Sequence, residues 1–347
     1  MRLAGAEAKN TYRNNAFFIK QSIGIPLVRM TPRDFSMADL PAVYVGHTFE
    51  YNEWSKVYVD KYSTFYNERA SRNPNGTYVG KTDTYYKDWY ISPERTRDST
   101  YERIITNRLF VQAQPWDRNG VVGTIDGGVG LDLHTYSQFA VKDYLSGKDG
   151  RVKKLSWFAY AGVEGKIRRW VNWGADFKIY PSGYRGGDYS VGAHASFTAY
   201  IKKKPFTLSG EFSESNTTPG YWLTNWSSNH YRWQNSFRKE GETRFNVSFT
   251  VPDHGIELGF WQSVLRNKVY YGADCMPTQH NGVVSVTSIY AQKNFVIKGL
   301  HLDHRVLVQF TSNRHVVPVP LCSAFLSYYY EFWVKRDVLR VQVGIDG

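Results

Sequence analysis

The chain is poor in cysteine and methionine, and no long apolar run occurs in it. Only Cys275 and Cys322 carry thiols among 347 residues, and only four residues are Met. Two cysteines cannot supply a disulfide scaffold or a cysteine-based zinc site. Nowhere do about 18 apolar residues follow one another without a charge, so the sequence excludes a membrane protein built from spanning helices.

Aromatic residues are abundant, with 26 Tyr, 11 Trp and 20 Phe. A chain that is 42% hydrophobic can bury enough surface to fold, which excludes disorder. Tyr and Trp favour boundaries between apolar and aqueous surroundings. The composition therefore suits a transmembrane β-barrel, a sugar-binding all-β protein or a fibrous surface protein.

Apolar and polar residues alternate from about residue 101 to the end, as they do in strands with one apolar face. The pattern is clearest over 121–134, where odd positions carry Val121, Ile125, Val129 and Leu131, and even positions carry Asp126, Asp132 and His134. The alternating segments run for about 9 to 17 residues. Strands that cross lipid need about 9 to 11 residues, whereas soluble sheets use about 5 or 6.

Tight and loose connections alternate along the chain, as in outer-membrane barrels. We expect tight turns at 165–168, 202–205, 239–242, 298–299 and 335–337, and loose loops at 181–187, 213–220, 274–282 and 312–320. Aromatic clusters are expected to form girdles at the membrane interfaces. They include Trp170, Trp173, Tyr180, Tyr184, Tyr221, Trp222, Trp226, Tyr270, Tyr271 and Tyr328 to Tyr330.

These patterns predict an all-β fold, an antiparallel up-and-down transmembrane β-barrel of about 13 to 16 strands that need not be complete. Residues 1–347 form one barrel domain in this interpretation, and the polar stretch 61–100 is a long extracellular loop. The alternative is a secreted or cell-surface all-β protein that binds glycans through exposed Trp and Tyr.

Polar residues of the alternating pattern are expected to line the pore. Strand parity alone selects them, and a slip of one residue would turn them all outward. The predicted pore-lining residues are Asp126, Asp132, His134, Asp176, Lys178, Arg244, His301, Asp303, Arg305, Gln309, Arg340 and Gln342. Inward arginines such as Arg244, Arg305 and Arg340 would favour anions.

No motif predicts an enzyme, a metal or a cofactor. The chain has no nucleophile elbow, phosphate loop or zinc-protease helix. His301 and His304 fall on opposite faces of a strand, so they cannot chelate one metal ion. Asp126, Asp132 and His134 share a face and make a barrel-embedded hydrolase conceivable, but any water-filled lumen presents such residues.

The net charge of +12 indicates possible contact with anionic partners. Nucleic acid is disfavoured because the basic residues are dispersed and Lys202 to Lys204 form the only triplet. Basic residues at the rims suit lipid head groups. Cys275 and Cys322 are expected two strands apart, about 10 Å, which is beyond disulfide reach and predicts two free thiols.

Several runs in the last hundred residues resemble a known family. They are GIELGF at 255–260, LRNKVYY at 265–271, PTQHNG at 277–282, LHLDHRV at 300–306, VVPVPL at 316–321, SYYYEF at 327–332 and LRVQVGID at 339–346. Together these are similar to the "putative porin" family of Gram-negative outer-membrane β-barrels. The resemblance is good over 245–347 and looser before it.

The resemblance implies an outer-membrane porin-like protein that allows passive diffusion of small polar solutes and is not an enzyme. Its implied partners are outer-membrane lipid and lipopolysaccharide, small polar or anionic solutes and further copies of the chain. Members normally carry a signal peptide and further strands, with a terminal aromatic residue. Because residues 1–10 lack an apolar core and the last residue is Gly347, we expect a fragment whose signal peptide was lost by truncation.

Overall fold

The computed structural model describes residues 8–27, 42–60, 71–72, 78–79, 90, 96–114, 121–138 and 150–347. Within these ranges strands dominate, and the helical elements are the single turns α2 (Tyr221–Thr224) and η2 (Pro252–His254). None of the helices in these ranges is long and apolar enough to cross a membrane.

Fourteen strands form one sheet in which each strand lies antiparallel to the next one along the chain. This confirms the predicted all-β up-and-down architecture, and the strand number lies within the predicted range. The strands are β1 (Lys9–Pro26), β2 (Ala42–Asp60), β5 (Thr96–Gln114), β6 (Thr124–Gln138), β7 (Arg151–Ile167), β8 (Val171–Gly183), β9 (Tyr189–Ile201), β10 (Lys204–Thr217), β13 (Glu240–Val251), β14 (Ile256–Arg266), β17 (Val283–Ile297), β18 (Leu300–Thr311), β19 (Cys322–Lys335) and β20 (Leu339–Asp346).

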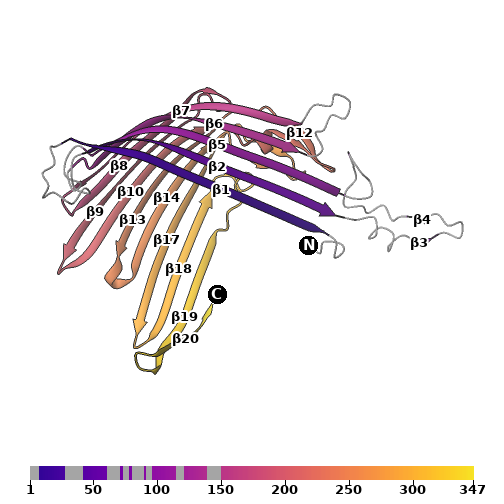
Figure 1. Cartoon of the computed structure of the whole chain (residues 1–347). Helices are drawn as coiled ribbons and strands as arrows, with labels where there is room; N and C mark the ends of the chain where they lie inside the picture. The colour runs from indigo at the N-terminus through magenta and orange to yellow at the C-terminus, as the bar shows by residue number, and fades with distance from the viewer. Residues whose placement is uncertain are drawn as a thin grey trace.

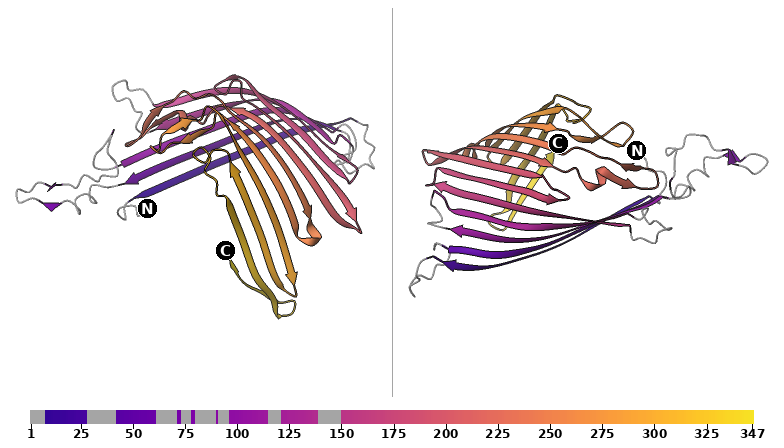
Figure 2. Two further views of the ribbon diagram at one scale, coloured as in Figure 1. Left: turned by 180° about the vertical axis from the view of Figure 1, so that it is seen from behind. Right: turned by 90° about the horizontal axis from the view of Figure 1, so that it is seen from above.

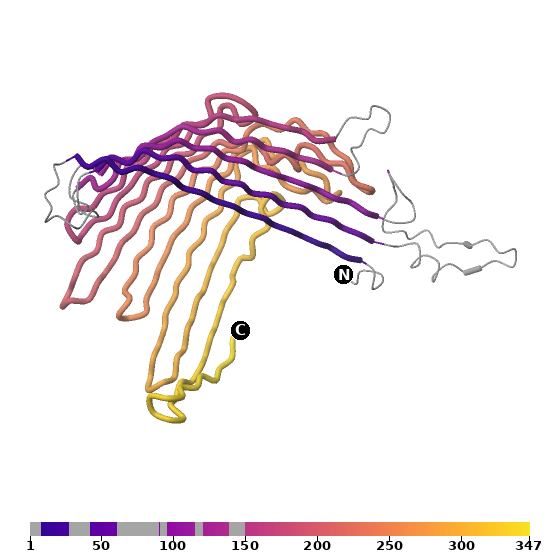
Figure 3. The backbone as a smooth tube through the Cα atoms, in the orientation of Figure 1, coloured from indigo at the N-terminus to yellow at the C-terminus, as the bar shows by residue number. Residues whose placement is uncertain are grey.

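The sheet is strongly curved, like part of a barrel wall, and its strands change direction steadily from β1 to β20 (Figures 1 and 2). Among the described strands the order is linear, so β1 and β20 are its two edges. Figure 3 shows the N-terminal and C-terminal strands at opposite ends of the curved sheet. A sheet edge exposes unpaired N–H and C=O groups, which hydrocarbon does not tolerate.

From β7 onward, short and long connections alternate along the sheet. The short ones join β7 to β8, β9 to β10, β13 to β14, β17 to β18 and β19 to β20. The expected tight turn at 239–242 is wrong, because β13 begins at Glu240 and the short turn of that hairpin is η2 at its other end. Residues 218–239 form a long connection instead.

Only part of the predicted extracellular loop at 61–100 lies within the described ranges. Strand β5 begins at Thr96, so residues 96–100 belong to the sheet. Most of residues 61–95 lie outside the described ranges, which include only the short strands β3 (Ser71–Arg72) and β4 (Tyr78–Val79) and residue Tyr90. The loop therefore stays a prediction.

The turn between β9 and β10 has an unusual backbone. Lys202 and Lys203 both have positive φ, at 51° and 66°. Two successive residues with positive φ are typical of a type I′ hairpin turn, which matches the twist of the strands but normally uses Asn and Gly. Two lysines in this conformation are strained.

One face of the sheet is apolar and exposed. Phe197, Leu208, Leu258, Ile289 and Phe310 come from five different strands, and each leaves at least 47% of its surface uncovered. The register aligns such residues across neighbouring strands, as with Leu208 opposite both Phe197 and Phe249. A continuous apolar face of this kind suits contact with lipid.

Candidate functional site: the polar face of the sheet

The opposite face carries the residues that strand parity selected. Directly opposed residues of antiparallel strands share a face, and this ladder leads from Asp126 through Asp176 to Arg244. The same rule assigns the other predicted residues to that face: Asp132, His134, Lys178, His301, Asp303, Arg305, Gln309, Arg340 and Gln342. Their role in lining a pore stays a prediction.

Three open cavities of about 570, 550 and 560 Å³ lie along this face. The second brings together five predicted residues, namely Asp126, Asp132, His134, Asp176 and Lys178. The third is lined by Arg244 and Gln309, together with Asp176. The remaining five residues, His301, Asp303, Arg305, Arg340 and Gln342, line none of these three cavities.

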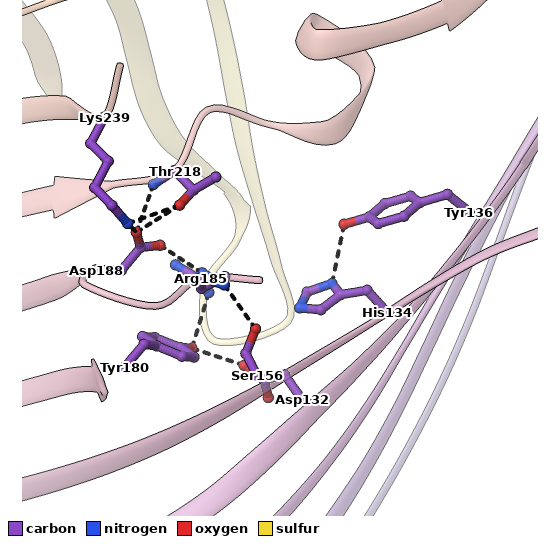
Figure 4. Close-up of polar contacts among 9 residues, drawn as sticks. All are labelled: Asp132, His134, Tyr136, Ser156, Tyr180, Arg185, Asp188, Thr218 and Lys239. Atoms are coloured by element: carbon purple, nitrogen blue, oxygen red, sulfur yellow. Dashed lines mark hydrogen bonds and ion pairs between the residues drawn. The ribbon is translucent and has the colours of Figure 1, made fainter. Parts of the chain in front are cut away.

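Asp132 is the centre of a buried polar network (Figure 4). Thr106 donates a hydrogen bond to one carboxylate oxygen at 2.7 Å, and Tyr180 donates to the other at 2.8 Å. Arg185 in turn donates from Nη1 to the Tyr180 hydroxyl at 3.0 Å. Asp132 is only 5% exposed, so these donors replace the water that a carboxylate needs.

The network continues through Asp188, in the turn between β8 and β9 (Figure 4). Arg185 Nε lies 3.0 Å from Asp188 Oδ2, while Oδ1 accepts the Lys239 ammonium and both the N–H and the hydroxyl of Thr218. Burial alone would raise the pKa of Asp188, but the bonds from Lys239, Thr218 and Arg185 outweigh it and hold the pKa below its ordinary value. Asp188 is therefore an anion that joins the β8–β9 turn to the segment 218–239.

His134 does not form a catalytic pair with the aspartates. Its Nδ1 lies 3.2 Å from the Tyr136 hydroxyl, and Nε2 is buried without a hydrogen-bond partner. Asp132 is bonded to Thr106 and Tyr180 rather than to the imidazole. Acid–base relays need a base that is oriented by a hydrogen bond to its carboxylate, and this geometry does not provide one.

Ionic partners neutralise two of the three arginines that were expected to attract anions. Arg244 Nε lies 2.6 Å from Glu242, and Arg340 is paired with Glu331. Arg305 donates to Gln292 at 3.1 Å. In the second cavity Arg108, Lys178 and Arg185 are accompanied by five acidic residues, which are Glu50, Asp126, Asp132, Glu164 and Asp176. The second cavity thus has no excess of positive charge, whereas the first is lined by three basic and two acidic residues.

The segment 218–239 folds over the polar face instead of extending away from it. Trp222 Nε1 donates to Glu102 at 2.9 Å, and the Ser227 N–H donates to Gln138 at 2.9 Å. The Tyr136 and Tyr221 rings stack with centroids 4.0 Å apart. A connection that leaves β10 therefore contacts β5 and β6 from across the face.

The assignment of several aromatics to interface girdles is consequently wrong. Tyr221, Trp222 and Trp226 belong to the inward-folded segment. Tyr180 is 3% exposed and bonds to Asp132 on the polar face. Glu102 and Gln138 accept hydrogen bonds from the segment 218–239 and so replace water as its partners. These bonds explain why the segment lies on the polar face.

Parity missed Arg185, Asp188, Thr218 and Lys239, because these residues lie in connections to which a period-2 pattern does not apply. Their only sequence signal is opposite charge at close spacing, in Arg185-Gly-Gly-Asp188. Among the described residues no group of three or more His, Cys, Asp and Glu is placed to hold a metal ion. Cys275 and Cys322 are exposed free thiols, as predicted.

A family model described as "Putative porin" matches residues 1–347. The chain belongs to this family. The match covers the whole sequence, although the sequence runs that resemble the family are concentrated after residue 245. Membership and the two-faced antiparallel sheet place the chain among outer-membrane β-barrel proteins.

One of the similar solved structures supports the fold. The siderophore receptor PirA from Pseudomonas aeruginosa matches 97% of this chain and 62% of its own length, with a TM-score of 0.52 and 11% identity. The FrpB iron transporter from Neisseria meningitidis matches 94% of this chain and 67% of its own, with a TM-score of 0.31 and 8% identity. The toluene transporter TodX from Pseudomonas putida matches 99% and 84%, with a TM-score of 0.24 and 9% identity.

The chain thus spans about 62% of the length of the PirA structure. No curated protein sequence matches the chain. At these identities the structural likeness concerns the fold alone.

Proposed function

We propose that the chain forms the wall of an outer-membrane pore through which small polar solutes diffuse passively. The observation that carries this proposal is the separation of two faces on one continuous sheet of long strands. One face exposes Phe, Leu and Ile, and the other bears charged residues around three cavities. A lipid-facing exterior around a wet interior is the arrangement of a porin.

The proposal includes closure of the sheet. An edge such as β1, a strand of 18 residues, would leave the backbone groups along its outer side unpaired in lipid. We infer that in the membrane the edges of β1 and β20 are covered by strand pairing. Pairing with each other and pairing with additional strands would both leave the polar face of the sheet as described above.

The mechanism requires no chemical step. A solute that enters the lumen exchanges part of its water shell for the carboxylates, amides and hydroxyls of the polar face. Because Arg244 and Arg340 are paired with glutamates, we expect the wall to favour polar solutes in general rather than anions. Residues 218–239 lie over this face and would narrow the path.

Swelling of liposomes in sugar solutions of graded size tests this function. Protein refolded into the liposomes should admit arabinose quickly and the trisaccharide raffinose slowly, whereas liposomes with boiled protein should show neither. Heat-modifiable migration on a gel checks that a folded barrel is present. Swelling no faster than that of plain liposomes, from a sample that shows this migration, would contradict the proposal.

A further inference from the structure

A small hairpin within the segment 218–239 is fixed firmly to the sheet. It consists of β11 (Asn225–Ser227) and β12 (Arg232–Gln234). At its turn, the Asn229 N–H donates to Asp98 at 2.9 Å and the Asn229 side chain donates to Thr96 at 3.2 Å. Asn229 and Thr96 are each only 1% exposed. The hairpin is therefore held in one position against β5.

A cavity of about 210 Å³ lies between this hairpin and strands β2 and β5. Tyr58 of β2, Trp226 of β11 and Tyr231 of the hairpin turn contribute aromatic rings to its lining. Aromatic walls with a few polar groups are typical of small-molecule sites. The volume is below the roughly 300 to 1,000 Å³ of sites for drug-sized ligands, so it suits a ligand of a single ring.

The Trp226 ring is held in place by its neighbours. It stacks on Trp233 with centroids 5.5 Å apart and an angle of 15°, and it meets Trp222 edge to face at 5.9 Å. Trp233 Nε1 also donates to the Trp222 carbonyl at 3.0 Å. A ring fixed before the ligand arrives loses little conformational freedom on binding, which favours affinity.

The charged groups of the cavity balance one another. Lys56 and Asp98 both line it, together with the imidazole residue His230 and the hydroxyl residues Thr100 and Ser228. One basic and one acidic group give no net attraction for an ion of either sign, while together they offer donors and acceptors for hydroxyl groups. Apolar ring faces beside such groups match a pyranose, whose C–H faces are apolar and whose edge bears hydroxyls.

We propose that this cavity is a binding subsite for a neutral hexopyranose on the path of the pore. The inference rests on the proposed function in treating the sugar as a solute in transit. Binding itself requires only the hairpin and the ends of β2 and β5. The two parts can therefore be tested separately.

Binding is tested by tryptophan fluorescence of the refolded chain in a detergent without a sugar head group. Glucose is the probe, and sorbitol is the control because it has hydroxyls but no ring. Glucose should give a saturable change and sorbitol none. Tyr58→Ala should weaken the apparent affinity by roughly threefold to tenfold, the range for loss of one ring contact.

The control variant is Tyr44→Ala, which changes the same residue type on the same strand and face, fourteen positions away from Tyr58. It should bind glucose like the parent chain. If Tyr58→Ala fails to refold, Thr100→Val changes the cavity lining with almost no change of shape and should also weaken binding. A linear response to glucose, or equal responses to glucose and sorbitol, would overturn the inference.

Channel recordings separate the two proposals. Channel steps without saturable glucose binding would refute the subsite and leave the pore. Saturable binding without channel steps would refute the pore and leave a sugar site on a membrane β-sheet.

Discussion

At the scale of single residues, neighbouring strands approach so closely at some glycines that no methyl group can be added. Gly130 of β6 lies on the polar face beneath the Phe158 ring. A methyl group there would come within 2.4 Å of that ring and 2.6 Å of the Asn107 carbonyl oxygen. Gly128 and Gly130 thus mark positions where the neighbouring strand β5 approaches too closely for a side chain.

Gly130→Ala should therefore destabilise the folded sheet by about 1 to 3 kcal/mol, because the carbonyl belongs to the neighbouring strand and cannot move freely. The free energy of unfolding by urea in detergent measures the effect. Gly210→Ala is the matched control, since a methyl group there meets only the Asn246 carbonyl oxygen at 3.9 Å. Equal stability of the two variants would contradict this account.

The carboxylate of Asp188 should make stability depend on pH. Its pKa is lowered in the folded chain, so its contribution is complete above the unfolded-state pKa of about 3.9 and is lost as the pH falls through the lowered value. Asp188→Asn should cost roughly 1.5 to 3 kcal/mol at pH 7, because Arg185 and Lys239 lose a charged partner.

Urea unfolding at pH 7 and at pH 3 checks this prediction. The stability gap between the parent chain and Asp188→Asn should narrow at the lower pH. Asp274→Asn is the control, because Asp274 is exposed and should change little at either pH. A gap that stays constant with pH would show that Asp188 acts without its charge.

At the scale of elements, the turn between β9 and β10 offers a gain in stability. Lys203 has a φ of 66°, a conformation that costs a residue with a side chain about 1 to 2 kcal/mol and glycine almost nothing. After allowance for the greater freedom of glycine in the unfolded chain, Lys203→Gly should stabilise by about 0.5 to 1 kcal/mol. Lys204→Gly, at the first position of β10, should not. The midpoint of urea unfolding should rise for Lys203→Gly and should not rise for Lys204→Gly.

Strands and connections differ in how far the sequence predicts them. The alternation over 121–134 places Asp126, Asp132 and His134 on one face, because side chains of a strand alternate strictly. The path of residues 218–239 depends on bonds to Glu102, Gln138 and Asp98, which are about 90 to 130 positions away. Local patterns contain no information about such partners, so Trp222 and Trp226 were assigned to a girdle.

Local patterns also do not show which charged residues are neutralised by a neighbour. Parity grouped Arg244 and Arg340 with polar residues, but it did not show the glutamates that neutralise them. Glu242 lies two residues from Arg244 on the same strand, and Glu331 lies diagonally across from Arg340 on the neighbouring strand β19. Only the register reveals the pair between Arg340 and Glu331. The expectation of anion preference therefore weakens, while the polar character of the face is retained.

At the scale of the whole molecule, the chain forms one curved sheet (Figure 1). This sheet separates an apolar face from a polar one. The sequence predicts this because a period of two persists through strands long enough to cross lipid. Closure of the sheet is a different matter. It depends on which strands cover the edges β1 and β20, and a period of two within a strand does not specify a pairing partner.

The most direct test of the pore is conductance across a planar lipid bilayer after refolding of the chain in detergent. We predict discrete steps of current. In a salt gradient the reversal potential should lie near zero or indicate a preference for cations, because acidic residues outnumber basic ones around the second cavity. Absence of steps from a sample that retains its β structure would contradict the central claim that the polar face lines a pore.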